Sequence, residues 1–499
     1  MFFVVKRLVK KIIFLFVLFS TSVLFSQTVL NSTPLEIRES NRSNQLLTVE
    51  NKATHEVFVF AANNENLSIL QYSNSLFLKD KYTTPLKNID NKSLIGYSFS
   101  EDGNPTLYWS TPDFEIILAV KFFLESKTSR ILYFKFASSR QYVVAEFQEN
   151  DSFNILTKDL DDQALMLYSF KNGNVAEKLL DFSAFRFQDK NGKLRTFTEI
   201  IRENPIEKMD ETEYNPLYTS TAKTKLYVLP NRMIFTFDYN PKSTQIFDFN
   251  IETEEIKEKN FTQAISEKGR KLSNSFFQDD KLYQVTANEE ELSFDVKDYN
   301  TGENLKNIRV SKNDTIKFKI SPLFIQREGR KPSELKTTKK FLKHLTYLDP
   351  GLSVFKNNQK TYFTIGGTPK INEMDAFPNF DYLDPDIAAL IPAVYNSFGT
   401  MHTESVYFES VFDSNYSFIK QENLEPLAMD NIFYFLNTNK KIALNNIIKY
   451  KDFYILGYYD SASKQYIMRK FKDGFNADDP FLNEIKTPSS FKRPFLKTP

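Results

Sequence analysis

The sequence predicts an all-β protein built from repeated antiparallel hairpins, and three observations lead to this fold class. Short segments in which apolar and polar residues alternate recur along the chain, with turn residues between them. Aromatic residues, which favour the pleated and half-buried surfaces of strands, make up 15% of the 499 residues. Strand–turn–strand units also match one another over long sequence distances, and this third observation selects the architecture.

The clearest unit covers residues 233–256, MIFTFDYNPKSTQIFDFNIETEEI, in which two alternating segments flank the turn NPKS. Residues 281–310 repeat the second half of this unit, and Phe247 matches Phe294 at a spacing of 47 to 48 residues. The middle hairpin of the unit recurs in residues 93–110 and 451–471, and its closing hairpin recurs in residues 164–182. A repeat of this length with about four strands predicts a β-propeller of four-stranded blades.

Each blade exposes an apolar face, which is buried when neighbouring blades stack around an axis. We expect about seven blades, with six or eight as the neighbouring possibilities. They lie near residues 56–84, 94–136, 141–182, 185–261 (one blade or two), 273–310, 352–420 and 432–485. The alternative is a pair of β-sandwich domains, which do not predict matching turns far apart. The resemblance to bacterial β-propellers is architectural, because the single Trp109 disfavours the Trp-bearing WD repeat and no Kelch pattern occurs.

The first 26 residues have the pattern of a secretory signal peptide. MFFVVKRLVKK carries four positive charges, a continuous stretch of apolar or small residues follows, and Ser26-Gln27 ends the leader. We expect cleavage after Ser26. An uncleaved anchor is the alternative, but a membrane span needs roughly 20 apolar residues. The chain has no cysteine, which excludes disulfides, thiolate metal sites and a lipoprotein anchor.

The composition and the leader indicate where the protein works. The 64 basic residues oppose 63 acidic ones, so no net charge favours nucleic acid or an anionic membrane surface. The leader ending FSQ and the Phe-, Asn- and Lys-rich body resemble exported proteins of flavobacteria and their relatives. This resemblance implies the periplasm or the cell surface of a Gram-negative bacterium. We expect a secreted, soluble mature chain without an integral membrane segment.

The expected organisation is a signal peptide at 1–26, an N-terminal extension at 27–50, a propeller at 51–486 and a polar C-terminal tail at 487–499. Two insertions, at 326–345 and 366–403, interrupt the propeller, and both should lie on one of its faces. The first has helical spacing and a helix start at Pro332-Ser333. The charged residues 201–224 read as a long surface loop.

The two insertions carry the binding residues that we predict, because loops this long are uncommon unless they are functional or disordered. The basic candidates are Arg330, Lys339 and Lys343, and the candidates of the second insertion are Phe380, Tyr382, Tyr395 and His402. Their structural alternatives are a solvated helix face for the basic residues and a small local core for the aromatic residues.

The sequence contains no motif for catalysis, a metal or a cofactor. The three histidines have no short metal-ligand spacing, and neither a nucleophile elbow nor a phosphate-binding loop occurs. We therefore predict no metal, no cofactor and no nucleic-acid partner, and we name no catalytic residue. The expected function is a non-enzymatic binding or scaffold propeller for an envelope protein, surface protein or polysaccharide. The alternative is a glycan- or peptide-directed hydrolase with carboxylates at the propeller axis.

Overall fold

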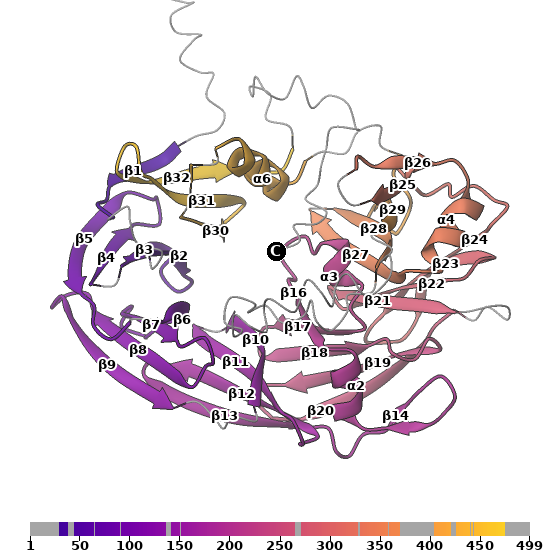
Figure 1. Ribbon diagram of the computed structural model, residues 1–499, viewed down its shortest axis with the longest axis horizontal. Helices are drawn as coiled ribbons and strands as arrows, with labels where there is room; N and C mark the ends of the chain where they lie inside the picture. The colour runs from indigo at the N-terminus through magenta and orange to yellow at the C-terminus, as the bar shows by residue number, and fades with distance from the viewer. Residues whose placement is uncertain are drawn as a thin grey trace, which may run out of the picture.

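The computed structural model describes residues 29–474 except 38–43, 64, 90, 136–140, 150, 265–270, 328–329, 358, 370–403, 421–425, 440 and 443. In this part of the chain, seven sheets of four or five strands follow one another around a ring (Figure 1). The protein is therefore a β-propeller, as the sequence predicts, and the alternative of tandem sandwiches is wrong. All strand pairs are antiparallel except β16 with β17.

The blades are numbered along the chain. Blade 1 comprises β2 (Gln45–Asn51), β3 (Glu56–Ala62), β4 (Asn66–Tyr72) and β5 (Leu78–Pro85). Blade 2 comprises β6 (Ser93–Phe99), β7 (Pro105–Ser110), β8 (Ile116–Phe123) and β9 (Thr128–Lys135). Blade 3 comprises β10 (Gln141–Glu149), β11 (Ser152–Asp159), β12 (Ala164–Lys171) and β13 (Asn174–Asp181). A small hairpin, β14 (Phe187–Gln188) and β15 (Leu194–Arg195), follows.

Blade 4 comprises β16 (Ile206–Met209), β17 (Thr224–Leu229), β18 (Arg232–Phe237), β19 (Ser243–Asn250) and β20 (Ile256–Thr262). Blade 5 comprises β21 (Leu272–Gln278), β22 (Lys281–Ala287), β23 (Glu291–Asp298) and β24 (Asn304–Ser311). Blade 6 comprises β25 (Leu323–Arg327), β26 (Ser333–Leu335), β27 (Asp349–Asn357), β28 (Lys360–Thr368) and β29 (Glu404–Phe412). Blade 7 comprises β30 (Asn445–Tyr450), β31 (Phe453–Asp460), β32 (Gln465–Phe471) and β1 (Val29–Pro34).

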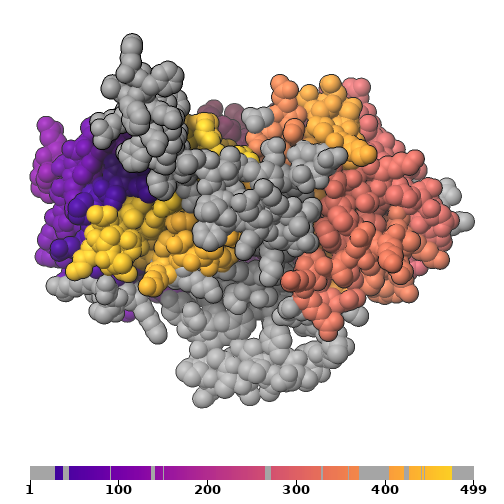
Figure 2. Space-filling view, turned by 90° about the horizontal axis from the view of Figure 1, so that it is seen from above, coloured from indigo at the N-terminus to yellow at the C-terminus, as the bar shows by residue number. Residues whose placement is uncertain are grey.

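The two ends of the described chain close the ring. β1 is the outermost strand of blade 7 and pairs with β32 from Val29 opposite Arg469 to Pro34 opposite Gln465. Figure 2 shows the indigo N-terminal residues against the yellow C-terminal blade. Residues 27–50, which we expected to precede the propeller, thus contribute β1 and most of β2 to it. The ladder between β1 and β32 joins the first and last strands of the ring, so opening the ring means breaking it.

The repeat seen in the sequence corresponds to equivalent strands of different blades. Strands are counted from the centre of the ring, leaving out the extra inner strand β16 of blade 4. Phe247 and Phe294 then both lie on the third strand of their blades and are fully buried. Residues 233–250 and 453–471 both form the hairpin between second and third strands, as predicted. Residues 93–110 instead form the first hairpin of blade 2, so their match to the middle hairpin was wrong. Alternation alone does not distinguish one hairpin of a blade from the next.

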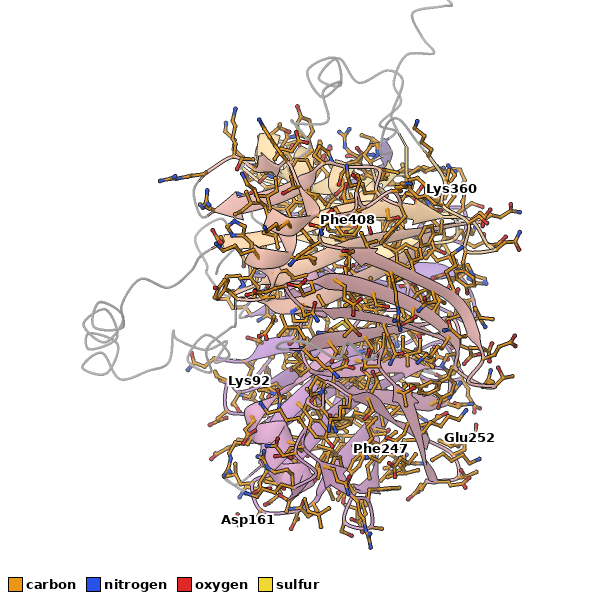
Figure 3. All side chains as sticks on the ribbon, turned by 90° about the vertical axis from the view of Figure 1, so that its right-hand side faces the viewer. Lys92, Asp161, Phe247, Glu252, Lys360 and Phe408 are labelled. Carbon is orange, nitrogen blue, oxygen red and sulfur yellow. The ribbon has the colours of Figure 1, made fainter. Side chains whose placement is uncertain are left out.

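The propeller has two faces, and Figure 3 shows them on opposite sides. Lys92 and Asp161 mark the insertion face, which carries the connections between blades and between second and third strands. Glu252 and Lys360 mark the opposite face, which carries the tight turns. Thr368, where β28 ends, and Glu404, where β29 begins, both lie at the insertion face.

Three helices fill wedges between neighbouring blades. α2 (Phe197–Glu203) packs between blades 3 and 4, where the Phe197 ring stacks on Phe182 with centroids 4.2 Å apart. α4 (Thr338–Leu345) packs between blades 5 and 6, and α6 (Ala428–Thr438) covers the apolar side of blade 7. Each helix buries its apolar stripe on a sheet, which is where most of the stability of such short helices comes from.

Two segments differ from the sequence prediction. Residues 201–224 are no surface loop: they form the end of α2, the inner strand β16 and the short helix α3 (Leu217–Ser220), whose side chains are partly buried against blades 4 and 6. The helix expected to start at Pro332-Ser333 begins only at Thr338, with Thr337 as its N-cap. Ser333–Leu335 pair instead with β25 as β26, because the outer strand of blade 6 comes before its inner strands in the chain.

Candidate functional site

The predicted basic candidates lie on one exposed surface, which we call the α4 surface. Its members are Arg330, Lys331, Lys336, Lys339, Lys340, Lys343 and Tyr347, and all are exposed. None of the six cations forms an ion pair with any residue of the described part of the chain. Residues 330–347 contain these six cations and one carboxylate, Glu334, so this short segment is strongly positive in a protein of net charge +1.

The amphipathic pattern of α4 orients these cations. Phe341, Leu342 and Leu345 are completely buried, and the Phe341 ring lies 5.6 Å from that of Phe408. With this stripe fixed on β29, Lys339 and Lys343 must point outward, about 6 Å apart along the helix axis. The outer face of α4 is therefore exposed to solvent, while its inner face is buried on the sheet. A solvated helix face and a surface that binds a partner are both compatible with this arrangement.

Glu404 ties α4 to the strand that follows the second insertion. Its carboxylate bonds His344 Nδ1 at 2.6 Å and Arg327 Nε at 3.2 Å. Arg327 and His344 lie beside the α4 surface, and both bond the Glu404 carboxylate. Glu404 therefore pairs with Arg327 and His344 and with none of the six cations of the α4 surface.

The other predicted binding residues cannot be placed. Phe380, Tyr382, Tyr395 and His402 lie outside the described residues, so their predicted role remains a prediction. Tyr347 was not among the predicted residues, although it is 67% exposed and lies two residues beyond the end of α4. An aromatic residue just past an amphipathic helix is the signal that would have indicated it.

A second candidate region lies at the inner edge of the ring. β16 adds an extra inner strand to blade 4, and it carries Glu207 and Lys208. Burial raises the pKa of Glu146, on the inner strand of blade 3, to about 7, although the positive charge of Lys208 opposes the shift. Carboxyl groups of this kind can remain protonated near neutral pH.

The segment after β16 adds two more carboxyl groups of the same kind. Burial, followed by the charges of Asp279 and Asp210, raises the pKa of Glu211 to about 7. Burial and Asp210 likewise raise the pKa of Glu213 to about 7. Sequence reasoning missed Glu211 and Glu213 because they share no motif, and because their burial arises only when the segment after β16 packs into the ring.

The described histidines have structural partners. His55 Nδ1 lies 2.8 Å from Glu50, and His344 is held by Glu404. Within the described ranges, no three His, Asp or Glu side chains come together as metal ligands would. No helix there is both long and apolar enough to cross a membrane.

Comparison with known proteins assigns this chain to no family. No family model and no curated protein match the sequence. Among solved structures, the WD40 domain of SCAP from fission yeast has a TM-score of 0.30 and 9% identity, over 88% of this chain and 83% of that one. The dihydro-heme d1 dehydrogenase NirN has a TM-score of 0.26 and 10% identity, over 91% and 82%. A cobalt-substituted Synechocystis ACO has a TM-score of 0.26 and 6% identity, over 54% of this chain and 61% of that one.

The chain thus spans less than two thirds of the ACO structure. Similarity at these levels carries no information on function.

Proposed function

We propose that the protein is an exported binding or scaffold propeller whose α4 surface docks an acidic partner of the cell envelope. The observation that carries the proposal is the set of six cations of the α4 surface, which have no carboxylate partner among the described residues. A helix anchored by a buried apolar stripe presents these charges at little entropic cost, since its backbone is already ordered.

The proposed partner is an envelope protein or a surface polysaccharide rather than nucleic acid, given the leader and the balanced net charge. Exposed cations act mainly on the rate of association and on specificity, and salt screens them. We therefore expect binding that weakens steeply as ionic strength rises.

The test is affinity capture of tagged chain 27–499 from an envelope extract of its own organism. The wild type is compared with the double variant Lys339→Glu/Lys343→Glu. The matched control is Lys190→Glu/Lys193→Glu, which reverses two exposed lysines beside the β14–β15 hairpin. Circular dichroism and thermal melting establish that all three proteins fold.

Loss of a salt-sensitive partner in the α4 variant, with retention in the control, supports the proposal. Equal capture by both variants moves the binding surface away from α4. A further variant lacking residues 370–403 then tests the second insertion, whose predicted residues lie outside the described part of the chain. Absence of any partner overturns the docking proposal.

The hydrolase remains a second candidate because of the carboxyl groups with raised pKa at the inner edge of the ring. A carboxylic acid that stays protonated near pH 7 can act as a general acid, and glycoside hydrolysis needs a second carboxylate roughly 5–9 Å away. Turnover of envelope glycans or peptides that is lost in Glu146→Gln or Glu213→Gln, but kept in the α4 variant, would favour this candidate.

A further inference from the structure

Segment 210–215 follows β16, the innermost strand of blade 4, and contacts two other blades (Figure 1). Ser353 of blade 6 donates to the main-chain oxygen of Asn215 at the end of the segment. Gln278 is the last residue of β21, and its Nε2 donates to the main-chain oxygen of Glu211 at 3.2 Å. The segment is therefore anchored on blade 6 by its end, and Gln278 bonds its middle to blade 5.

Two oxygen atoms of the residues at this contact have no hydrogen-bond donor. Oε1 of Glu211 and Oε1 of Gln278 are both buried, and neither bonds any group in the described part of the chain. Gln278 as a whole is only 5% exposed. A buried polar oxygen without a donor costs free energy, because it has lost its water and has gained no partner. An ionised Glu211 offers no donor, whereas a protonated carboxyl group carries an O–H.

The charges around Glu211 also disfavour its ionised form. Asp210 precedes it in the segment, and Asp279 and Asp280 form the turn between β21 and β22. Burial, followed by the charges of Asp279, Asp210 and Asp280, raises the pKa of Glu211 to about 7. The contact thus combines a partly buried carboxyl group with three neighbouring carboxylates.

The cations near this cluster are bonded to other carboxylates. Arg232 bonds Asp248 through Nε and Nη2, both at 2.8 Å, and lies 3.3 Å from Asp280. Lys356 pairs with Asp279 at 2.6 Å. Arg232 opposes the rise in the pKa of Glu211 but does not cancel it.

Tyr227 of β17 also faces this contact, and it stays neutral. Burial raises the pKa of Tyr227 well above its usual value, and its hydroxyl accepts from Phe277 N at 3.1 Å. Glu211 is therefore the group of this contact that changes its charge near neutral pH.

We propose that the contact is a pH-sensitive switch, in which a proton on Glu211 keeps segment 210–215 on blade 5 and loss of the proton releases it. The proton supplies a donor where the buried oxygens lack one. It also removes one negative charge from the cluster with Asp210, Asp279 and Asp280. Release gives these carboxylates back to water. The switch lies at the inner edge of the ring, so the inference does not depend on the proposed function of the α4 surface.

Hydrogen exchange of chain 27–499 at pH 6 and pH 8, followed by mass spectrometry of peptides that cover residues 206–216, tests the inference. Observed rates are divided by the intrinsic rates at each pH, which gives the opening equilibrium of the segment. Because Glu213 in the same segment also has a raised pKa, the reference protein is Glu213→Gln. The test protein is Glu211→Gln/Glu213→Gln. The matched control is Glu213→Gln/Glu252→Gln, which removes an exposed carboxylate in the turn between β19 and β20.

The opening equilibrium of the reference protein should increase about threefold to tenfold from pH 6 to pH 8. The upper value corresponds to the full difference between a pKa of 4.5 in the released segment and about 7 in the folded contact, and solvent screening lowers it. The control should show the same increase, and the test protein should show none. Infrared spectra at pH 6 should show one protonated carboxyl group fewer in the test protein than in the reference.

A second variant keeps the test decisive if Glu211→Gln disturbs the fold. Asp279→Asn in the reference protein removes the neighbouring charge that raises the pKa of Glu211 most, so opening should begin at a lower pH. Asp279 lies in an exposed turn, and thermal melting establishes that each variant folds.

An opening equilibrium that stays constant from pH 6 to pH 8 in the reference protein overturns the proposal. An equal increase in the test protein overturns it too. Suppression of opening at pH 8 by calcium has the same consequence, because the buried oxygens then serve a metal ion and not a proton.

Discussion

The most demanding prediction concerns the ion pair between Lys225 and Asp238, which is completely buried. Asp238 accepts three short hydrogen bonds, from Ser275 N at 2.9 Å, from the Ser275 hydroxyl at 2.7 Å and from the Thr244 hydroxyl at 2.7 Å. Lys225 Nζ lies farther away, at 3.5 Å, and also donates to Asn274. The carboxylate is thus well satisfied without the lysine, whereas the lysine depends on the carboxylate.

This asymmetry predicts which of the two single variants destabilises the protein more. Asp238→Ala leaves a buried ammonium group without its counter-charge and should lower the free energy of unfolding by about 3–5 kcal/mol. Lys225→Met leaves a carboxylate that still accepts three hydrogen bonds and should cost about 2 kcal/mol. Shifts of the urea midpoint at constant slope give both values. The reasoning fails if Lys225→Met is as costly as Asp238→Ala.

A pH series supplies an independent reading of the same pair. Burial lowers the pKa of Lys225 from 10.5 to about 8, even though Asp238 opposes the shift. Between these two values the folded chain binds fewer protons than the unfolded chain, so this group makes the free energy of unfolding rise with pH. The difference in stability between wild type and Lys225→Met should therefore increase from pH 8 to pH 10. A difference independent of pH would contradict a desolvated lysine.

Three further predictions follow from the fold. Burial raises the pKa of Glu213 from 4.5 to about 7. Between these pH values the folded chain binds more protons than the unfolded chain, so the free energy of unfolding falls as pH rises. In Glu213→Gln, the urea midpoint should therefore depend less on pH between pH 5 and pH 7 than it does in the wild type. Phe247→Ala removes a ring whose centroid lies 4.9–5.5 Å from those of four other phenylalanines. It should lower the free energy of unfolding in urea by about 3–5 kcal/mol. The control Thr253→Ala, at an exposed position, should leave that free energy almost unchanged. Deleting residues 29–34 removes β1, which should lower the melting temperature and abolish hydrogen-exchange protection along the edge of β32; unchanged protection would refute closure of the ring by this strand.

The blade repeat could be predicted from the sequence because its signal is local. Alternation and turn residues lie within about 20 residues, and Phe247 and Phe294 keep equivalent positions in neighbouring blades. The closure of the ring by β1 could not be predicted in this way. Its partner β32 lies more than 400 residues away, and the sequence of neither strand indicates the pairing. The same limit applies to the order of strands in blade 6, where β25 precedes the inner strands and pairs with β29.

The same limit determines which candidate sites could be predicted from the sequence. The cluster of cations at the α4 surface could be predicted because these residues lie in a single segment. The structure adds the direction in which their side chains point. The contacts of Lys259 and Lys297 could not be predicted, because each lysine bonds a main-chain oxygen of the neighbouring blade that is distant in sequence. Candidate sites formed by one segment can be identified from sequence, whereas those formed between blades require the ring.

The wedges between neighbouring blades differ in what fills them. Neighbouring blades diverge toward the outside of a ring, and the space between them must be filled or solvated. α2 fills it between blades 3 and 4 and α4 between blades 5 and 6, each with buried apolar side chains. Between blades 4 and 5, Lys259 and Lys297 span the space instead and bond the carbonyl groups of the opposite walls. A lysine in that position costs desolvation that an apolar side chain does not. The hydrogen bonds to the opposite walls, and the contact of Lys259 with the Tyr299 ring, offset this cost and tie the two blades together.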